Sequence, residues 1–174
     1  MIAVYILIAI VAVFLIGAYL RPRYVQVERH TEIAAAPEAV YAHVSSLKAF
    51  HEWSPWTGRD PNMEVTWSGP DQGVGNVMEW RSDVKGVGNG RQEITEVDEN
   101  RQVKTALDFG SMGTAEAWFD LVPKGDGATR VTWGLNADMG NNPMGRWFGM
   151  MMDKWVGADY ETGLSNLKAR VEGG

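Results

Sequence analysis

The sequence contains no cysteine, and this absence excludes several kinds of chemistry at once. With Cys 0, the chain forms no disulfide, no thiolate nucleophile and no cysteine-ligated zinc or iron–sulfur centre. Histidine is scarce, with 3 residues, and His43 and His51 do not have the spacing of a compact ligand pair. We therefore expect no metal site and no cofactor, and the sequence singles out no catalytic residue.

Basic residues are in the minority. The chain has 16 Lys and Arg against 22 Asp and Glu, a formal net charge of −6. Proteins that bind nucleic acid normally carry a basic stripe, so we expect no nucleic-acid partner. Hydrophobic residues make up 45% of the 174 residues, which is enough to bury a core. No linker rich in Pro, Gly or Ser divides residues 24–174, so we expect one domain there.

Charge is absent from residues 2–20, an apolar run at the amino terminus. As a helix, this run would extend close to the ~30 Å of a bilayer core, at about 1.5 Å per residue. Tyr19 and Tyr24 lie near its end, where aromatic side chains favour the headgroup layer. We predict that residues 1–21 form a transmembrane anchor.

Two alternatives to an anchor are a cleaved signal peptide and a buried core helix. A signal peptide usually has a basic start and an A-x-A-like cleavage site, and neither pattern is present. A soluble core helix is rarely apolar on every face. Arg21, Arg23 and Arg29 follow the run, so the positive-inside rule predicts a single-pass membrane protein with its globular part in the cytoplasm.

The rest of the chain has the pattern of an α+β domain. Residues 24–33 alternate apolar and polar side chains, as a half-buried strand does. A short helix is expected from Pro37, followed by an aromatic loop over residues 50–56. From residue 63, turn residues separate six expected strands: 63–68, 75–83, 91–97, 102–109, 114–122 and 128–137.

A long helix is expected over residues 143–171. Asn142 and Pro143 are typical of a helix start. Gly157 and Gly163 are mild interruptions. Apolar residues recur at helical spacing and predict one stripe: Met144, Trp147, Phe148, Met151, Trp155, Leu164, Leu167 and Val171.

Five stretches of the chain form a further pattern: APEAVYAHVSSLKAFHEWSPW, GVGNVMEW, ITEVDENRQV, FDLVPKGDGATRVTWGL and ETGLSNLKARVE. Together they resemble the START-like, or SRPBCC, superfamily, in particular its polyketide cyclase/dehydrase and lipid-transport branch. The likeness covers about residues 25–172. It implies a helix-grip fold, in which a curved antiparallel sheet of about six to seven strands surrounds the last helix and leaves an apolar cavity. The family has no universal catalytic residue, so the resemblance implies a pocket without a defined reaction.

Apolar residues that share a strand face or the helix stripe are the candidates for ligand contact. Trp offers a large flat face and Met adapts to irregular shapes, which suits a flat or flexible apolar ligand. The alternative is ordinary core packing. The candidate ligand-binding residues are Trp53, Trp56, Met78, Trp80, Leu107, Phe119, Trp133, Trp147, Met151 and Trp155.

Three functions are compatible with this pattern. The first is a membrane-tethered carrier or sensor of a hydrophobic small molecule, such as a lipid, an isoprenoid or a polyketide-like compound. The second is a cyclase- or dehydrase-type enzyme, which requires a titratable group such as His51 to point inward. The third, which resemblance to a co-chaperone-like branch of the superfamily would allow, is a protein-interaction module with an apolar patch on the outer sheet around Trp118 or Trp67. The sequence does not identify a protein partner.

Overall fold

The computed structural model describes residues 1–173, and its seven strands form one antiparallel sheet. The strand order is β1-β7-β6-β5-β4-β3-β2, so that β2 to β7 form a meander and β1 is the edge strand beside β7. The strands are β1 (Tyr24–Ile33), β2 (Glu64–Ser68), β3 (Val77–Arg81), β4 (Gly90–Asp98), β5 (Gln102–Asp108), β6 (Thr114–Pro123) and β7 (Thr129–Asp138).

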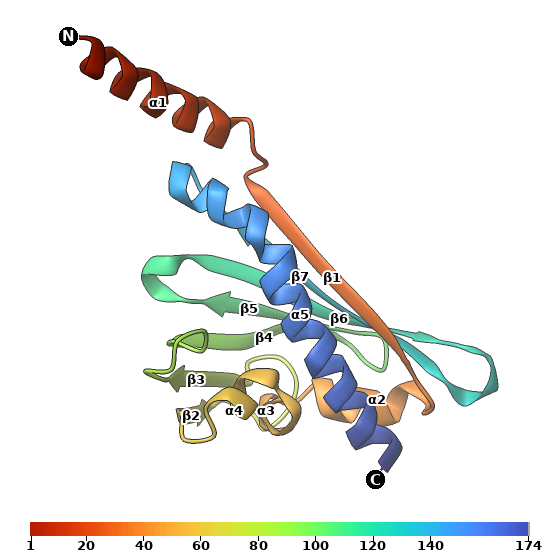
Figure 1. The fold of residues 1–174 in the computed structure, drawn as a ribbon. Helices are drawn as coiled ribbons and strands as arrows, with labels where there is room; N and C mark the ends of the chain where they lie inside the picture. Colours follow the sequence, from red (N-terminus) through yellow and green to blue (C-terminus); the bar gives the residue numbers. More distant parts are fainter. Residues whose placement is uncertain (174) are drawn as a thin grey trace.

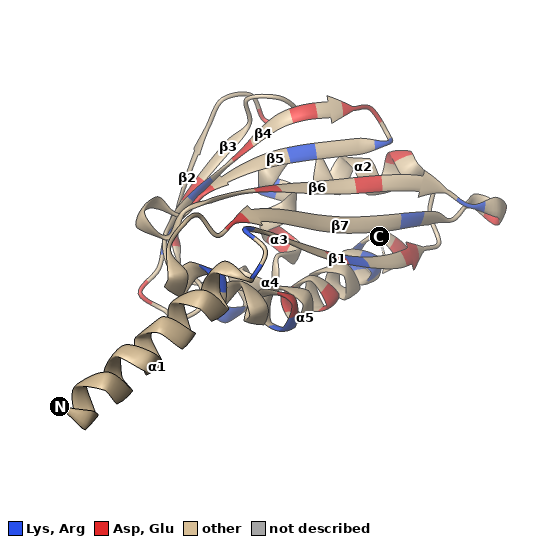
Figure 2. Ribbon diagram, turned by 90° about the horizontal axis from the view of Figure 1, so that it is seen from above, with Lys and Arg blue, Asp and Glu red and all other residues tan. Residues whose placement is uncertain are grey.

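The helices gather on one side of this sheet (Figure 1; Figure 2). They are α1 (Ile2–Tyr19), α2 (Pro37–Val44), α3 (Leu47–Trp53), α4 (Pro55–Arg59) and α5 (Pro143–Gly173), with short 3-10 turns at Gly110–Met112 and Gly125–Gly127. α5 crosses the inner face along β1, whereas α1 projects away from the sheet. This arrangement confirms the predicted α+β helix-grip fold.

The expected aromatic loop over residues 50–56 is wrong, because this segment belongs to two helices. Ser54 leaves the helical conformation, with φ −56° and ψ 132°, and so separates α3 from α4. Pro55 then occupies the first turn of α4, where a missing N–H costs nothing. The amide of Leu47, the first residue of α3, donates to the side chain of Asn76 at 2.7 Å, and this cap comes from a distant part of the chain.

Two glycines let α5 approach the sheet closely. At Gly157, the guanidinium of Arg29 occupies the space that a Cβ atom would need. At Gly163, a Cβ atom would lie 2.6 Å from the ring of Trp133 and 3.1 Å from Pro55. The glycines that look like interruptions in the sequence are therefore contact positions of the helix.

Arg29 joins β1 to α5 across Gly157. Its guanidinium donates to the carboxylates of Asp153 at 2.9 Å and Glu161 at 2.7 Å, one helical turn to either side of the glycine. The hydrogen bond to Asp153, and next in size the one to Glu161, raise the pKa of Arg29. The bond between Arg29 and Asp153 also lowers the pKa of Asp153. Charge-assisted bonds of this kind fix the position of the helix along the strand.

We expect Gly163→Ala to destabilise the protein. The new methyl group would overpack against Trp133, which cannot move aside easily because it stacks on Tyr160 at 3.8 Å. Overpacking costs about 1–3 kcal/mol, against a helix-propensity gain of about 1 kcal/mol. The measurement is denaturant unfolding of the full chain in detergent. Gly173→Ala, where a Cβ atom meets nothing within 4 Å, is the matched control and should not lower stability. A Gly163→Ala variant as stable as this control would contradict the close packing.

Candidate functional site

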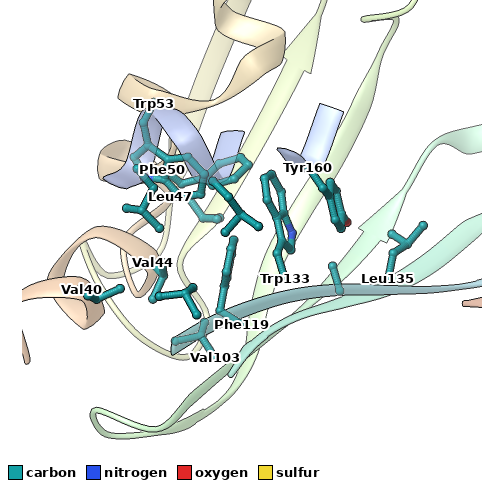
Figure 3. Packing of buried hydrophobic residues seen from close by; sticks show 14 of the residues in the cluster. Val40, Val44, Leu47, Phe50, Trp53, Val103, Phe119, Trp133, Leu135 and Tyr160 are labelled. Carbon is teal, nitrogen blue, oxygen red and sulfur yellow. The ribbon is translucent and has the colours of Figure 1, made fainter. Parts of the chain in front are cut away.

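One end of the inner face is filled by aromatic rings (Figure 3). Trp133 of β7 lies at the centre of this cluster, stacked on Tyr160 of α5 with ring centroids 3.8 Å apart. Phe119 lies 5.0 Å, Trp53 5.5 Å and Trp56 5.9 Å from the same ring. The structure thus brings together four of the predicted site residues, Trp53, Trp56, Phe119 and Trp133, and packs them against one another.

The next rows of the same face carry small side chains. Ala115, Ala117 and Ala137 are buried and point inward; we call them the alanine floor. Ala115 pairs with Ala137, and Ala117 pairs with Leu135, directly beside the row in which Phe119 pairs with Trp133. Along the sheet, the side chains therefore change from large rings to methyl groups. The sheet therefore contributes less side-chain volume to the interior at this end than at the aromatic end.

α5 presents apolar side chains and one phenol to the core on this side of the sheet. Met152 and Val156 face the core from α5 and are partly buried. Tyr160 is 2% exposed, and Figure 3 shows its phenol oxygen on the side of the ring that faces Leu135. Burial and then the charge of Asp159 raise the pKa of Tyr160, and no hydrogen bond from a described residue contributes to the shift. The phenol therefore stays protonated and can donate a hydrogen bond to a ligand.

Two buried polar side chains lie on the strands beside the alanine floor. Gln92 of β4 donates to the hydroxyl of Thr105 of β5 at 3.2 Å. The Thr105 hydroxyl in turn lies 3.5 Å from the carbonyl of Ala117. The amide oxygen of Gln92 remains an acceptor, so this pair and Tyr160 provide both hydrogen-bonding roles around an apolar floor.

Met78, Trp80 and Leu107 border the same rows. Met78 of β3 pairs with Gln92, and Gln92 pairs with Leu107. Trp80 and Leu107 are only half-buried, unlike Trp133 or Phe119. These three predicted residues share the inner face with the alanine floor, at its less tightly covered side.

The alanine floor lies at the end of the sheet nearest α1. Ala137 precedes Asp138, the last residue of β7, and Asp138 accepts hydrogen bonds from Arg23 at 2.7 and 2.6 Å. Arg23 follows α1 by a few residues. Its hydrogen bonds, helped by the backbone amide of Gly140, lower the pKa of Asp138 to about 2.

Trp147, Met151 and Trp155 do not join the other predicted residues. Met151 and Trp155 are 42% and 46% exposed, and Trp147 packs against α1, with its ring 5.8 Å from that of Phe14. The first half of the predicted stripe therefore lies on the outer face of α5 and not against the sheet. Three of the α5 residues that face the sheet or the core are glycines, which have no side chain to contribute to a hydrophobic pattern. The full set is Gly149, Met152, Val156, Gly157, Tyr160, Gly163, Leu164 and Leu167.

The outer face of the sheet is polar. One shallow hollow on this face, of about 520 Å³, is lined by residues that include Arg91, Asp108 and Glu116. A second, of about 430 Å³, is lined by residues that include Glu96 and Lys104. Charged residues are spaced along several of the strands (Figure 2).

Neither tryptophan expected to form an outer apolar patch does so. Trp118 lies flat over Gly134 and is half-buried. Trp67 pairs with the buried Met78 and therefore faces inward. The interaction-module hypothesis thus loses the patch that motivated it.

Two half-buried histidines lie on the short helices. The ring of His51 packs edge-on against Trp67 at 5.7 Å, and its Nδ1 is 3.1 Å from the hydroxyl of Thr57. The Nδ1 of His43 is buried, with no hydrogen-bond partner among the described residues. Burial lowers the pKa of both; Arg170 adds to the effect at His43, and Glu52 opposes it at both. Both imidazoles are therefore neutral near pH 7.

We expect the free energy of unfolding to fall as the pH drops from about 8 to about 5. The unfolded chain takes up protons on His43 and His51 near the usual pKa of 6.5, whereas the folded chain does so only at lower pH. Protons therefore favour the unfolded state on the acid side. Denaturant unfolding across this range should give a flatter profile for the His43→Gln/His51→Gln variant. His30→Gln, at an exposed position, should retain the wild-type profile. A flat wild-type profile would contradict this account.

Solved structures of low sequence identity share this fold. One is Ara h 8.0201, at 13% identity and TM-score 0.63, covering 87% of this chain and 99% of that one. A second is norcoclaurine synthase from Thalictrum flavum, at 13% identity and TM-score 0.63, with 85% and 86% covered. A third is TTHA0849 from Thermus thermophilus, at 23% identity and TM-score 0.62, with 84% and 96% covered. At these identities, the likeness concerns the fold alone.

A family model matches most of the chain, although no curated protein does. The model describes polyketide cyclase/dehydrase and lipid transport proteins, and it matches residues 24–172, from the start of β1 into the last turn of α5. The match agrees with the SRPBCC resemblance and with the helix-grip architecture. The chain therefore belongs to the polyketide cyclase/dehydrase and lipid transport family.

Proposed function

We propose that the protein holds a hydrophobic small molecule between the alanine floor and α5, while α1 tethers it to a membrane. The observation that carries the proposal is the change along the inner face, from packed rings around Trp133 to the methyl groups of the alanine floor. A protein that needed only a solid core would gain by continuing the large side chains, since voids reduce stability. Membership in a family described by lipid transport supports the same function.

The lining favours a ligand with an apolar body and one polar group. Met152 and Val156 from α5, and Met78 and Leu107 from the sheet, offer flexible apolar contacts. Gln92, Thr105 and Tyr160 are the buried polar side chains in this region, and a polar group that entered without a partner would be costly. A lipid, an isoprenoid or a polyketide-like compound with a terminal hydroxyl or carbonyl group fits these demands.

The character of α1 supports the tether. The helix is 18 residues long, or about 27 Å at 1.5 Å per residue, and Ala18 is its one buried residue. A core helix would be buried along at least one face. In this proposal, residues 1–21 are the anchor and residues 24–174 form the ligand-binding domain. Arg21, Arg23 and Arg29 after the anchor favour a single-pass protein with its domain in the cytoplasm.

A second candidate is proton transfer to or from the bound molecule. His51 supports it, because its burial keeps the imidazole neutral and able to accept a proton. Native mass spectrometry of ligands bound to the wild-type protein and to His51→Gln separates the two functions. A different bound species in the variant indicates catalysis, and the same species in both indicates binding alone.

We expect Ala117→Leu to abolish ligand binding while leaving the fold intact. The larger side chain would occupy the proposed ligand volume instead of colliding with packed neighbours. The measurement is native mass spectrometry of the full chain extracted from membranes, with lipid analysis of what is released. Ala106→Leu on the adjacent strand is the matched control. Ala106 is opposite Glu116 in the sheet and points to the outer face, so this variant should retain the ligand.

Stability measurements show whether Ala117 faces a ligand space or a solid core. In a solid core, Ala117→Leu would cost about 1–3 kcal/mol of unfolding free energy through overpacking. A loss of that size, together with wild-type protein that arrives without a bound molecule, would overturn the proposed function.

A further inference from the structure

The first half of α5 exposes an apolar stripe that the fold does not cover. Met144, Phe148, Met151 and Trp155 are 65%, 47%, 42% and 46% exposed, and the rings of Phe148 and Trp155 contact each other at 5.3 Å. We call these four residues the outer stripe. Their spacing places them along one line of the helix, on a different side from the residues that face the sheet.

The outer stripe ends abruptly. On the same line of α5, the next positions are Ala158, Thr162, Ser165, Asn166 and Ala169, all exposed. One helix face is therefore apolar over its first three turns and polar or small afterwards. General surface composition does not explain such a boundary, but a change of environment along the helix does.

The apolar half of α5 is the half that contacts α1. The indole N–H of Trp147 donates to the carbonyl of Phe14 at 3.3 Å. A Cβ atom added at Gly17 would lie only 2.8 Å from the Trp147 ring. The first turns of α5 therefore lie beside the last two turns of α1. If α1 spans the bilayer, this level is the boundary between acyl chains and headgroups.

Cations gather at the same level. The guanidinium of Arg21 lies 5.1 Å from the Trp147 ring, and that of Arg146 lies 5.4 Å from the Tyr19 ring. Arg146 also donates to the carbonyl of Arg21 at 2.8 Å. From residue 139 to residue 152, Arg146 is the one charged residue in the sequence. Cations next to exposed aromatic and Met side chains are typical of a helix that lies in the interface of an anionic membrane.

We infer that the outer stripe of α5 is a membrane-binding surface, embedded in the lipid interface beside α1. The inference rests on the membrane tether of the proposed function and extends it, because it gives the domain a fixed orientation on the bilayer. α5 then has two apolar faces in its first half: Met152 and Val156 toward the alanine floor, and the outer stripe toward lipid. In this arrangement only α5 separates the proposed ligand site from the lipid interface, from which a hydrophobic ligand would come.

The absence of cysteine makes the test direct, since single cysteines can be introduced and labelled without background. Phe148→Cys and Met151→Cys place a nitroxide or fluorescent label on the outer stripe. Thr162→Cys, on the same helix face beyond the stripe, is the matched control. Val11→Cys in the middle of α1 reports on the tether itself. Each full-length variant is reconstituted into vesicles of equimolar phosphatidylcholine and phosphatidylglycerol, and accessibility to a water-soluble and a lipid-resident quencher is measured.

The expected result is a several-fold preference for the lipid quencher at positions 11, 148 and 151, and for the aqueous quencher at position 162. Lipid contact at 11 with aqueous exposure at 148 and 151 overturns this inference alone. Aqueous exposure at 11 overturns the tether of the proposed function. Shielding of 148 and 151 from both quenchers, which disappears as protein is diluted in lipid, shows that a second copy covers the outer stripe and also overturns the inference.

Discussion

The close approach of α5 to the sheet is the constraint on which the other features depend. The helix achieves it by omitting side chains at three inward positions. Gly157 makes room for the guanidinium of Arg29, and Gly163 for the ring of Trp133. At Gly149, an added Cβ atom would lie 2.9 Å from Val25 and 3.1 Å from Met139. Each glycine weakens the helix by up to about 1 kcal/mol relative to alanine, so the helix gives up some of its own stability for contact with β1 and β7.

This contact divides the interior into two unequal parts. Where Gly163 admits Trp133, aromatic rings from α3, α4 and β6 complete a packed cluster. Toward the other end of the helix, the glycines bring α5 onto β1, while the strands opposite Met152 and Val156 carry the alanine floor. The packed end supports the fold, and the end with small side chains is the one that we propose to hold the ligand.

The strand pattern was predictable from the sequence, but the phase of the last helix was not. The alternation of apolar and polar residues located the strands to within a few residues. The alternation that turns Phe119 inward also turns Ala117 inward, but a small residue such as alanine gives a weaker hydrophobic signal. On α5, glycines at inward positions weaken the hydrophobic pattern of the inward face. The strongest apolar stripe in the sequence, with Met151 and Trp155, therefore lies on the exposed face. The spacing of Tyr160, Leu164 and Leu167 carried the correct phase. The capping of α3 by Asn76 depends on a distant loop, which no local pattern reveals.

In the proposed function, α1 alone would not orient the domain, and two further contacts near α1 restrict its orientation. Arg23 pairs with Asp138 at the end of β7, but both side chains are substantially exposed, so water screens the pair and it contributes little. The contact of Trp147 with Phe14 and Gly17 joins a large ring to the helix itself, and aromatic pairs contribute about 0.5–1.5 kcal/mol beyond the area they bury. The orientation of the domain therefore rests mainly on Trp147. Trp147 lies in the second turn of α5, so the helix that we propose to cover the ligand is also the helix that contacts α1.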